Sequence, residues 1–274
     1  MGKPSRFDSL LGVRRLKRRI GEALRLNGAL PFFRPHHGIN GATIDLGDGP
    51  VVNYSGYNYL GLSGHPEVTA AAKAAIERYG TSVCASRIVS GEIPLHRELE
   101  EELADFLGAE KCLALVSGYN TNVTAIGHLY GPRDLIVHDE QAHNSIVKGC
   151  LQAQAKRIAF AHNDITVLEG VLAQNRASVQ RVLVVTEGAY SMAGDVPDLA
   201  ALAAVCRRYE AELMVDEAHS IGTLGATGRG LVEQQGLSDS PIDVRIGTLS
   251  KALASCGGFI VGEAALVDYL RYTL

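Results

Sequence analysis

The sequence predicts an α/β protein built on a mostly parallel sheet with helices on both faces. Short apolar runs with strand character alternate with helix-length segments through most of the chain. This alternation is typical of a parallel sheet whose crossover helices cover both faces. The runs that we predict to be strands are Cys112–Val116, Leu135–His138, Arg157–Phe160, Val182–Thr186, Glu212–Val215, Val244–Ile246 and Phe259–Val261.

The segments between these runs supply the helices. The gap between the last two strands is too short for a crossover helix, so the final strand is expected to run antiparallel. Upstream, residues 1–60 read as an N-terminal helix and a Pro-, Gly- and His-rich arm, and residues 61–274 as one large domain. The helices that we predict in the large domain are Pro66–Tyr79, Thr121–Tyr130, Asn144–Ala155, Ile165–Gln174 and Leu199–Tyr209.

Composition narrows the class of protein. The 274 residues are 46% apolar and 20% charged, which favours a folded domain, and the net charge of −4 gives no case for a nucleic-acid partner. We interpret the basic cluster Arg14–Arg19 as a solvated helix face. No run reaches the ~20 apolar residues of a membrane helix, and no signal peptide is visible. Five scattered cysteines without a CxxC pair suggest reduced thiols, no metal site and a cytoplasmic protein.

Polar and small residues follow five of the predicted strands. In parallel sheets, ligands bind beyond the carboxyl ends of the strands, so these residues are expected to meet at one edge. A purely structural protein does not need such a gathering. The segments are Ser117–Asn120, Asp139 with His143, Glu187–Ser191, Asp216–Ser220 and Thr248–Lys251.

Residues in these segments could each contact a different part of one ligand, although each also has an ordinary structural explanation. Gly118 and Tyr119 open a helix whose free N–H groups could bind a phosphate, or simply be capped, and Thr248 adds a hydroxyl. Asp216 would need a cationic partner, such as a protonated heteroaromatic nitrogen. His219 could hydrogen-bond a ring hydroxyl, and the ring of His143 could lie flat on an aromatic ligand.

Lys251 lies in the stretch GTLSKALASCGG, among small and hydroxyl residues. A lysine is costly to enclose unless its charge is neutralised or its amine is used. An amine that forms a Schiff base with an aldehyde meets both conditions. A phosphate cradle, a carboxylate for a ring nitrogen, a stacking ring and this lysine together describe a site for pyridoxal phosphate.

These motifs resemble the α-oxoamine synthases, pyridoxal-phosphate enzymes of the aspartate-aminotransferase fold (fold type I). Members include 8-amino-7-oxononanoate synthase, glycine C-acetyltransferase, 5-aminolevulinate synthase and serine palmitoyltransferase. The resemblance covers nearly all of the chain from about Asn53 onward. It is carried by YNYLGLSGHPEV, SRIVSGEIPLHRELEEELADFLG, SGYNTN, HNDI, TEGAYSMAGDVPDL, MVDEAHSIGTLGATGRG and GTLSKALASCGG.

The resemblance implies a role for individual residues. Lys251 would form the Schiff base with the cofactor and act as the catalytic base, with His143 and Asp216 as the other catalytic residues. Asn58 would reach the carboxylate of the amino acid, in a site at a dimer interface. For the cofactor itself, it implies that Asp216 pairs with the pyridine nitrogen, His219 bonds the ring hydroxyl, His143 stacks on the ring, Ser191 lies beside it, and Gly118, Tyr119 and Thr248 hold the phosphate.

The implied reaction is a decarboxylating condensation of an amino acid with an acyl thioester, carried on coenzyme A or a carrier protein, to give an α-amino ketone. The stretch Thr81–Arg87 is bulkier than usual for the family, which points toward a carrier-bound acyl donor. The small C-terminal domain of the relatives has no counterpart here, so we expect a fragment with a nearly complete cofactor domain.

Three other functions remain open from the residues alone. Another fold-type-I enzyme, such as an aminotransferase, would use the same cofactor. A non-catalytic scaffold subunit would lack the Schiff-base lysine, whereas Lys251 is present. A nucleotide-binding domain would need GxGxxG or GxxxxGK[ST] after the first strand, and SGYNTN is neither.

Overall fold

The computed structural model describes residues 5–237 and 240–274. The chain divides into two compact units, the first ending at Tyr54 and the second running from Ser55 to Leu274. From the sequence we predict a different division, between an arm of residues 1–60 and a large domain of residues 61–274. That division stays a prediction. No helix among the described residues is long and apolar enough to span a membrane.

The first unit holds few elements. They are η1 (Arg6–Ser9), α1 (Leu11–Asn27), β1 (Thr43–Asp45) and β2 (Pro50–Val52), with β1 and β2 paired antiparallel. α1 ends where Gly28 takes a left-handed conformation with φ of 71°, which glycine tolerates without steric cost. The N-terminal helix is therefore present as predicted, whereas this short two-stranded sheet is not among our predictions.

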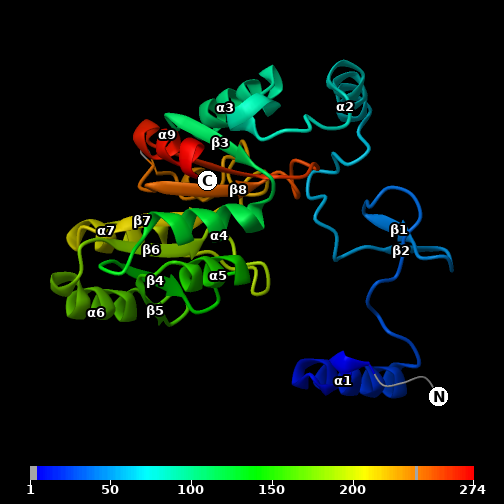
Figure 1. Cartoon of the computed structure of the whole chain (residues 1–274), viewed down its shortest axis with the longest axis horizontal. Helices are drawn as coiled ribbons and strands as arrows, with labels where there is room; N and C mark the ends of the chain where they lie inside the picture. The colour runs from blue at the N-terminus through cyan, green and yellow to red at the C-terminus, as the bar shows by residue number, and fades with distance from the viewer. Residues whose placement is uncertain (1–4, 238–239) are drawn as a thin grey trace. The chain divides into compact units, whose positions relative to one another are not determined.

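A seven-stranded sheet forms the centre of the second unit (Figure 1). Its strand order is β3-β9-β8-β7-β6-β4-β5. β9 runs antiparallel to β3 and β8, while the strands from β8 to β5 are parallel. The α/β class and the antiparallel final strand are confirmed. The strands are β3 (Lys111–Leu115), β4 (Leu135–Asp139), β5 (Lys156–Phe160), β6 (Val182–Glu187), β7 (Glu212–Asp216), β8 (Val244–Thr248) and β9 (Gly258–Gly262).

Helices cover both faces of this sheet. One core cluster joins one face to α4, α5 and α9, and a second joins the other face to α6, α7 and α8. A third packs α3 against β3 and β9. Alternate residues of β4 show the division, because Ile136 belongs to the first cluster and Leu135 and Val137 to the second. The elements are α2 (Pro66–Tyr79), η2 (Arg87–Gly91), α3 (Pro94–Leu107), α4 (Gly118–Leu129), α5 (Asn144–Gln152), α6 (Ile165–Asn175), η3 (Arg176–Ser178), α7 (Leu199–Arg208), α8 (Leu231–Gln234) and α9 (Ala264–Thr273).

The predicted helices are all found, with shifted ends. α4 starts at Gly118 because the Ser117 hydroxyl caps it by accepting the N–H of Asn120. α5 stops at Gln152 rather than Ala155 because Ala153 is extended. α3, α8 and α9 are not among our predictions.

Candidate active site

Lys251 lies in the loop that joins β8 to β9, and its amine contacts His219. Lys251 Nζ is 2.7 Å from His219 Nε2, and His219 Nδ1 is 2.8 Å from the Tyr59 hydroxyl. The amine also lies over the Tyr57 ring, 5.7 Å from its centroid. The loop is closed at its base, since the N–H of Leu249 donates to the carbonyl of Gly257. The side chains of His219 and Tyr57 therefore meet at this amine, and Tyr59 is linked to it through His219.

Burial lowers the pKa values of both Lys251 and His219. It lowers the pKa of the Lys251 amine below its ordinary value, against the opposing attraction of the Asp216 and Glu187 carboxylates. Burial, and then the charges of Lys251 and His143, lower the pKa of His219 to about 4. The imidazole is therefore neutral at pH 7. Either the ammonium of Lys251 donates to Nε2, or Nε2–H donates to a neutral amine while the Tyr59 hydroxyl donates to Nδ1.

Asp216 is the second centre of the site, at the end of β7. It is 5% exposed, and it has no ion-pair partner among the described residues. Its Oδ1 accepts the N–H of Ala218 at 3.0 Å, and its Oδ2 accepts Asn122 Nδ2 at 2.6 Å. Only neutral donors thus satisfy a buried carboxylate, which leaves it suited to a cationic ligand.

Asn122 links Asp216 to His143. The same Nδ2 group donates to Ser145 Oγ at 3.0 Å, and Ser145 Oγ is 2.7 Å from His143 Nδ1. Asn122 and Ser145 are 2% and 0% exposed, whereas His143 is exposed at the start of α5. The ring of Tyr119 meets the His143 ring edge-on, with centroids 6.2 Å apart. The chain of contacts fixes the imidazole while leaving it accessible.

Glu187 ends β6 beside Asp216, since these two residues are partners in the register of β6 with β7. It is 4% exposed, and its Oε1 accepts the N–H of His143 at 2.5 Å. Burial, and then the charge of Asp216, raise the pKa of Glu187 to about 8. A proton is therefore held next to Asp216 at neutral pH, when no cation is bound.

Glu187→Gln is expected to stabilise the cofactor-free protein at pH 8. The pKa of Glu187 is higher in the folded protein than in the unfolded chain. The free energy of unfolding therefore falls as pH rises from about 4.5 toward about 8, because the folded state keeps a proton that the unfolded chain releases. Glutamine can still accept from His143. At about 1.4 kcal/mol per pKa unit, the gain should be on the order of 1–4 kcal/mol. Urea unfolding between pH 5 and 8 measures it, with exposed Glu77→Gln as the control. An equal pH slope in both variants contradicts the assignment.

The start of α4 forms a compact cradle with β8 and β9. The first N–H groups of a helix lack partners within the helix, and here Ser117 caps only that of Asn120. A Cβ on Gly258 would lie 2.5 Å from the Gly118 nitrogen, so only glycine permits this approach. A Cβ on Gly118 would lie 3.0 Å from the Thr248 Cβ. Gly118 and Thr248 therefore lie against each other, with Tyr119 next in the chain.

Two further predicted residues, Ser191 and Asn58, lie in loops. Ser191 is exposed in the turn after β6. Asn58 lies in the loop of Tyr57 and Tyr59, and its side-chain oxygen accepts the N–H of Ser63 at 3.1 Å. The roles of both residues stay predictions. The sequence analysis missed Asn122, Ser145 and Tyr59, and it gave no role to Glu187.

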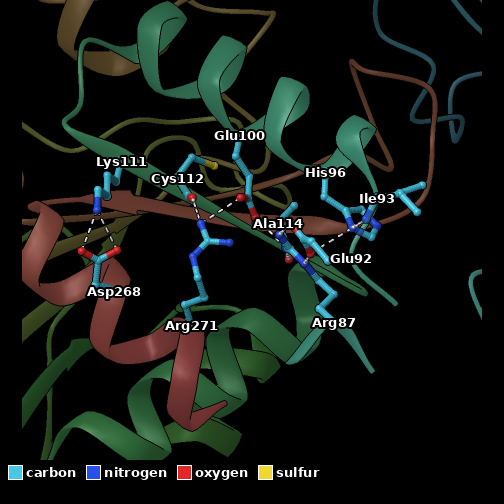
Figure 2. Close-up of polar contacts among 10 residues, drawn as sticks. All are labelled: Arg87, Glu92, Ile93, His96, Glu100, Lys111, Cys112, Ala114, Asp268 and Arg271. Carbon is cyan, nitrogen blue, oxygen red and sulfur yellow. Dashed lines mark hydrogen bonds and ion pairs between the residues drawn. The ribbon is translucent and has the colours of Figure 1, made fainter. Parts of the chain in front are cut away.

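A buried carboxylate ties the segment after residue 86 to the sheet and to α9 (Figure 2). Glu100 Oε1 accepts Arg87 Nη1 at 2.6 Å and the N–H of Ala114 at 2.8 Å, and its Oε2 accepts Arg271 Nη2 at 2.8 Å. Arg87 also pairs with Glu92 at 2.5 Å. These side chains line part of an open pocket of about 940 Å³ that reaches Leu249, at the base of the Lys251 loop.

Glu100→Gln is expected to destabilise the fold at pH 7. Burial opposes ionisation, but the hydrogen bonds from Arg87, Ala114 and Arg271 hold the pKa of Glu100 below its ordinary value. The stabilisation is present above the ordinary pKa of glutamate and fades as pH falls through the folded pKa. The loss should be about 1.5–3 kcal/mol at pH 7 and smaller near pH 3. Chemical denaturation measures it, and the exposed neighbour Glu101→Gln should leave stability unchanged. A loss that does not shrink in acid would contradict the charged role.

The arrangement fits pyridoxal phosphate. Its protonated pyridine nitrogen would supply the cation that buried Asp216 lacks, and its aldehyde would meet the half-buried Lys251 amine. The phosphate would find the start of α4, and the exposed His143 imidazole could cover the ring. Among the described residues, no group of His, Cys, Asp and Glu could hold a metal ion.

Comparison with known proteins gives consistent matches. Residues 49–273 match the family model of aminotransferase class I and II. A putative 8-amino-7-oxononanoate synthase of Gloeobacter violaceus is 44% identical over 91% of this chain and 64% of its own length. The 8-amino-7-oxononanoate synthase of Geobacter sulfurreducens is 43% identical over 91% of this chain and 63% of its own.

Solved structures resemble the chain as a whole. A serine palmitoyltransferase of S. paucimobilis with bound PLP–myriocin aldimine is 31% identical, with a TM-score of 0.89 over 98% of this chain and 66% of that one. A serine palmitoyltransferase of Sphingomonas wittichii is 32% identical, with a TM-score of 0.89 over 100% of this chain and 67% of that one. The chain thus spans less than two thirds of the length of these curated relatives.

Proposed function

We propose a function for this chain from one premise: the chain belongs to the aminotransferase class I and II family, within its pyridoxal-phosphate-dependent α-oxoamine synthases. The proposed reaction is the decarboxylating condensation of an amino acid with an acyl thioester, which yields an α-amino ketone. The observation that carries the proposal is the Lys251 amine, whose pKa is lowered and which lies 2.7 Å from His219.

Pyridoxal phosphate supplies an aldehyde that combines with amines and a cationic ring that withdraws electrons from the carbon next to the amine. Lys251 is the residue that would hold it covalently. Asp216 would keep the ring nitrogen protonated, and the Asn122 amide would hold that carboxylate in place. Gly118, Tyr119 and Thr248 would bind the phosphate, His143 would cover the ring, and His219 and Ser191 would hydrogen-bond its substituents.

Lys251 Nζ is also the base that we propose for removing the α-proton of the amino acid. Burial lowers the pKa of this amine, so it sheds a proton more readily than an exposed lysine. The neutral His219 can accept a hydrogen bond from the charged amine or donate one to the neutral amine. Tyr59 completes the link at His219 Nδ1. Asn58, in the same loop as Tyr59, is our proposed contact for the substrate carboxylate.

The proposal includes a thioester of coenzyme A or of a carrier protein. We further propose a homodimer that works in the cytoplasm, with the arm of residues 1–60 distinct from the cofactor domain of residues 61–274. Exposed apolar side chains at Val116, Ile88 and Tyr272, which line the pocket beside β3, support an interface there.

The test is to mix the protein and pyridoxal phosphate with single amino acids and follow the cofactor absorption. The accepted amino acid is then offered with acyl thioesters, and thiol and carbon dioxide are measured. An α-oxoamine synthase releases both, whereas an aminotransferase yields a keto acid and no thiol. A spectrum that no amino acid changes, with folded protein and bound cofactor, would favour a non-catalytic subunit.

A further inference from the structure

His162 lies between two carboxylates, one at the end of a strand and one in a loop, outside the contacts around Lys251. It belongs to the motif His162–Ile165, which follows β5 and opens α6. His162 Nδ1 is 2.8 Å from Asp139 Oδ1, and His162 Nε2 is 2.9 Å from Asp195 Oδ2. Asp139 ends β4, whereas Asp195 lies between β6 and α7. One ring therefore connects the end of β4 to the loop between β6 and α7, at the carboxyl edge of the sheet.

The neighbouring hydrogen bonds favour protons on both nitrogens of this ring. Asp139 is fully buried, and its oxygens accept the N–H groups of Gln141 and Asn163 at 2.8 and 2.9 Å. The hydrogen bond at His162 Nδ1 therefore takes its proton from the ring. At Nε2 the ring faces Asp195 Oδ2, which Asn163 Nδ2 also donates to at 3.0 Å. A lone pair at Nε2 would repel this oxygen, so the two carboxylates favour a proton on each ring nitrogen, whereas Asn163 Nδ2, 3.3 Å from Nε2, could donate only to the neutral ring.

Asp195 closes the turn that carries Ser191. The N–H of Tyr190 donates to the Asp195 carbonyl at 2.9 Å, and the N–H of Gly194 donates to the Tyr190 carbonyl at 2.8 Å. The Tyr190 ring meets the His162 ring edge-on, with centroids 4.5 Å apart. The Tyr190 hydroxyl is anchored 2.7 Å from Thr186 Oγ1 inside β6. His162 thus contacts this turn at both ends. Its ring lies against the Tyr190 ring at the start of the turn and against the Asp195 carboxylate at its end.

We propose that His162, as an imidazolium, is a positioning residue that holds the turn Tyr190–Asp195 closed and so keeps Ser191 beside the cofactor. The proposal rests on the proposed function, since the placement of Ser191 toward the cofactor comes from it. His162 itself touches neither the cofactor nor the substrate in this scheme. It acts through Asp195.

The charge on His162 makes this arrangement pH-dependent. Burial disfavours the charged ring, but the hydrogen bonds to Asp139 and Asp195 raise the pKa of His162 above its ordinary value. The Glu140 carboxylate, which accepts the N–H of His162 at 3.3 Å, adds a third negative group, and Tyr190 is the remaining titratable neighbour. The contact is therefore complete below the ordinary histidine pKa and is lost as pH rises through the folded pKa.

The experiment is amide hydrogen exchange of Tyr190 and Gly194 in the full chain between pH 6 and 9, corrected for intrinsic rates. In the unaltered protein, protection should fall at least about threefold as His162 deprotonates, with the same midpoint as the ring in a histidine NMR titration. His162→Gln should give low protection at every pH. His128→Gln, on the exposed face of α4, is the matched control and should behave like the unaltered protein.

Asp195→Asn separates a charge effect from a purely structural one. It keeps an acceptor for the ring but removes the charge, so the midpoint should move to lower pH while protection in acid persists. Protection that does not follow the His162 titration overturns the proposal, and so does a midpoint unmoved in Asp195→Asn. Cofactor affinity, measured in parallel, should weaken over the same pH range. If the cofactor never binds at Lys251, the proposed function fails, while the exchange data still decide whether His162 closes the turn.

Discussion

Borohydride reduction of the protein with pyridoxal phosphate is expected to fix the cofactor on Lys251 alone. Reduction converts a Schiff base to a stable amine, and of the lysines that the structure describes only Lys251 lies half-buried against His219. Burial also lowers the pKa of its amine. A modified lysine resists trypsin, so the label should appear on the uncut peptide Ile246–Arg271. Mass spectrometry of the digest reads the position directly.

Lys251→Ala should lose this label and at least about 10³-fold of any turnover, because the same amine serves as covalent anchor and as base. The exposed lysine of α5, replaced in Lys148→Ala, is the matched control and should keep both label and rate. Circular dichroism of the Lys251→Ala variant checks the fold. Label on another lysine, or no label on a folded protein that takes up the cofactor, would refute the assignment of Lys251.

The sheet and the residues at its edge could be read from the sequence for one reason. Apolar runs mark parallel strands, and the carboxyl ends of parallel strands meet at one edge, so residues that follow each run become neighbours. Asp216, His143 and the Lys251 segment are brought to this edge as predicted. The register of the strands adds one more neighbour, because Glu187 of β6 lies opposite Asp216 of β7.

The rest of the site depends on features that have no local sequence signal. Asn122 and Ser145 lie within the first turns of helices, and only the packing of α4 against α5 turns them toward Asp216. Tyr59 meets His219 from a loop far away in the chain. Glu100 stands in an acidic run that reads as solvated helix surface, yet it is 5% exposed and bound by two arginines.

The structure shows where the bulkier stretch Thr81–Arg87 lies. The bulkier stretch before Arg87 lines the open pocket beside β3, through Val83 and Ala85. Its influence on the acyl donor stays a proposal.

Asp216→Asn should impair catalysis far more than cofactor occupancy. An amide cannot keep the pyridine nitrogen protonated, so the ring no longer withdraws electrons effectively. The expected loss in kcat is about 10²–10³-fold, comparable with the loss of other preorganised charges, while cofactor affinity should change only several-fold. A pH titration of cofactor absorption gives a readout independent of turnover, since the ring nitrogen should lose its proton at lower pH in the variant.

The hydrogen bonds of Asp216 allow a sharper control. Its two oxygens accept from Asn122 Nδ2 and from the N–H of Ala218, so an asparagine keeps both contacts only if the Asn122 amide turns its oxygen toward the new NH2 group. In the double variant Asp216→Asn with Asn122→Asp, the contact between the two side chains is restored but the carboxylate is moved away from the ring nitrogen. If the position of the charge matters, the double variant regains stability without regaining kcat. Recovery of kcat in the double variant, or near-normal rates in Asp216→Asn, would show that Asp216 serves the site through its hydrogen bonds and not through its charge.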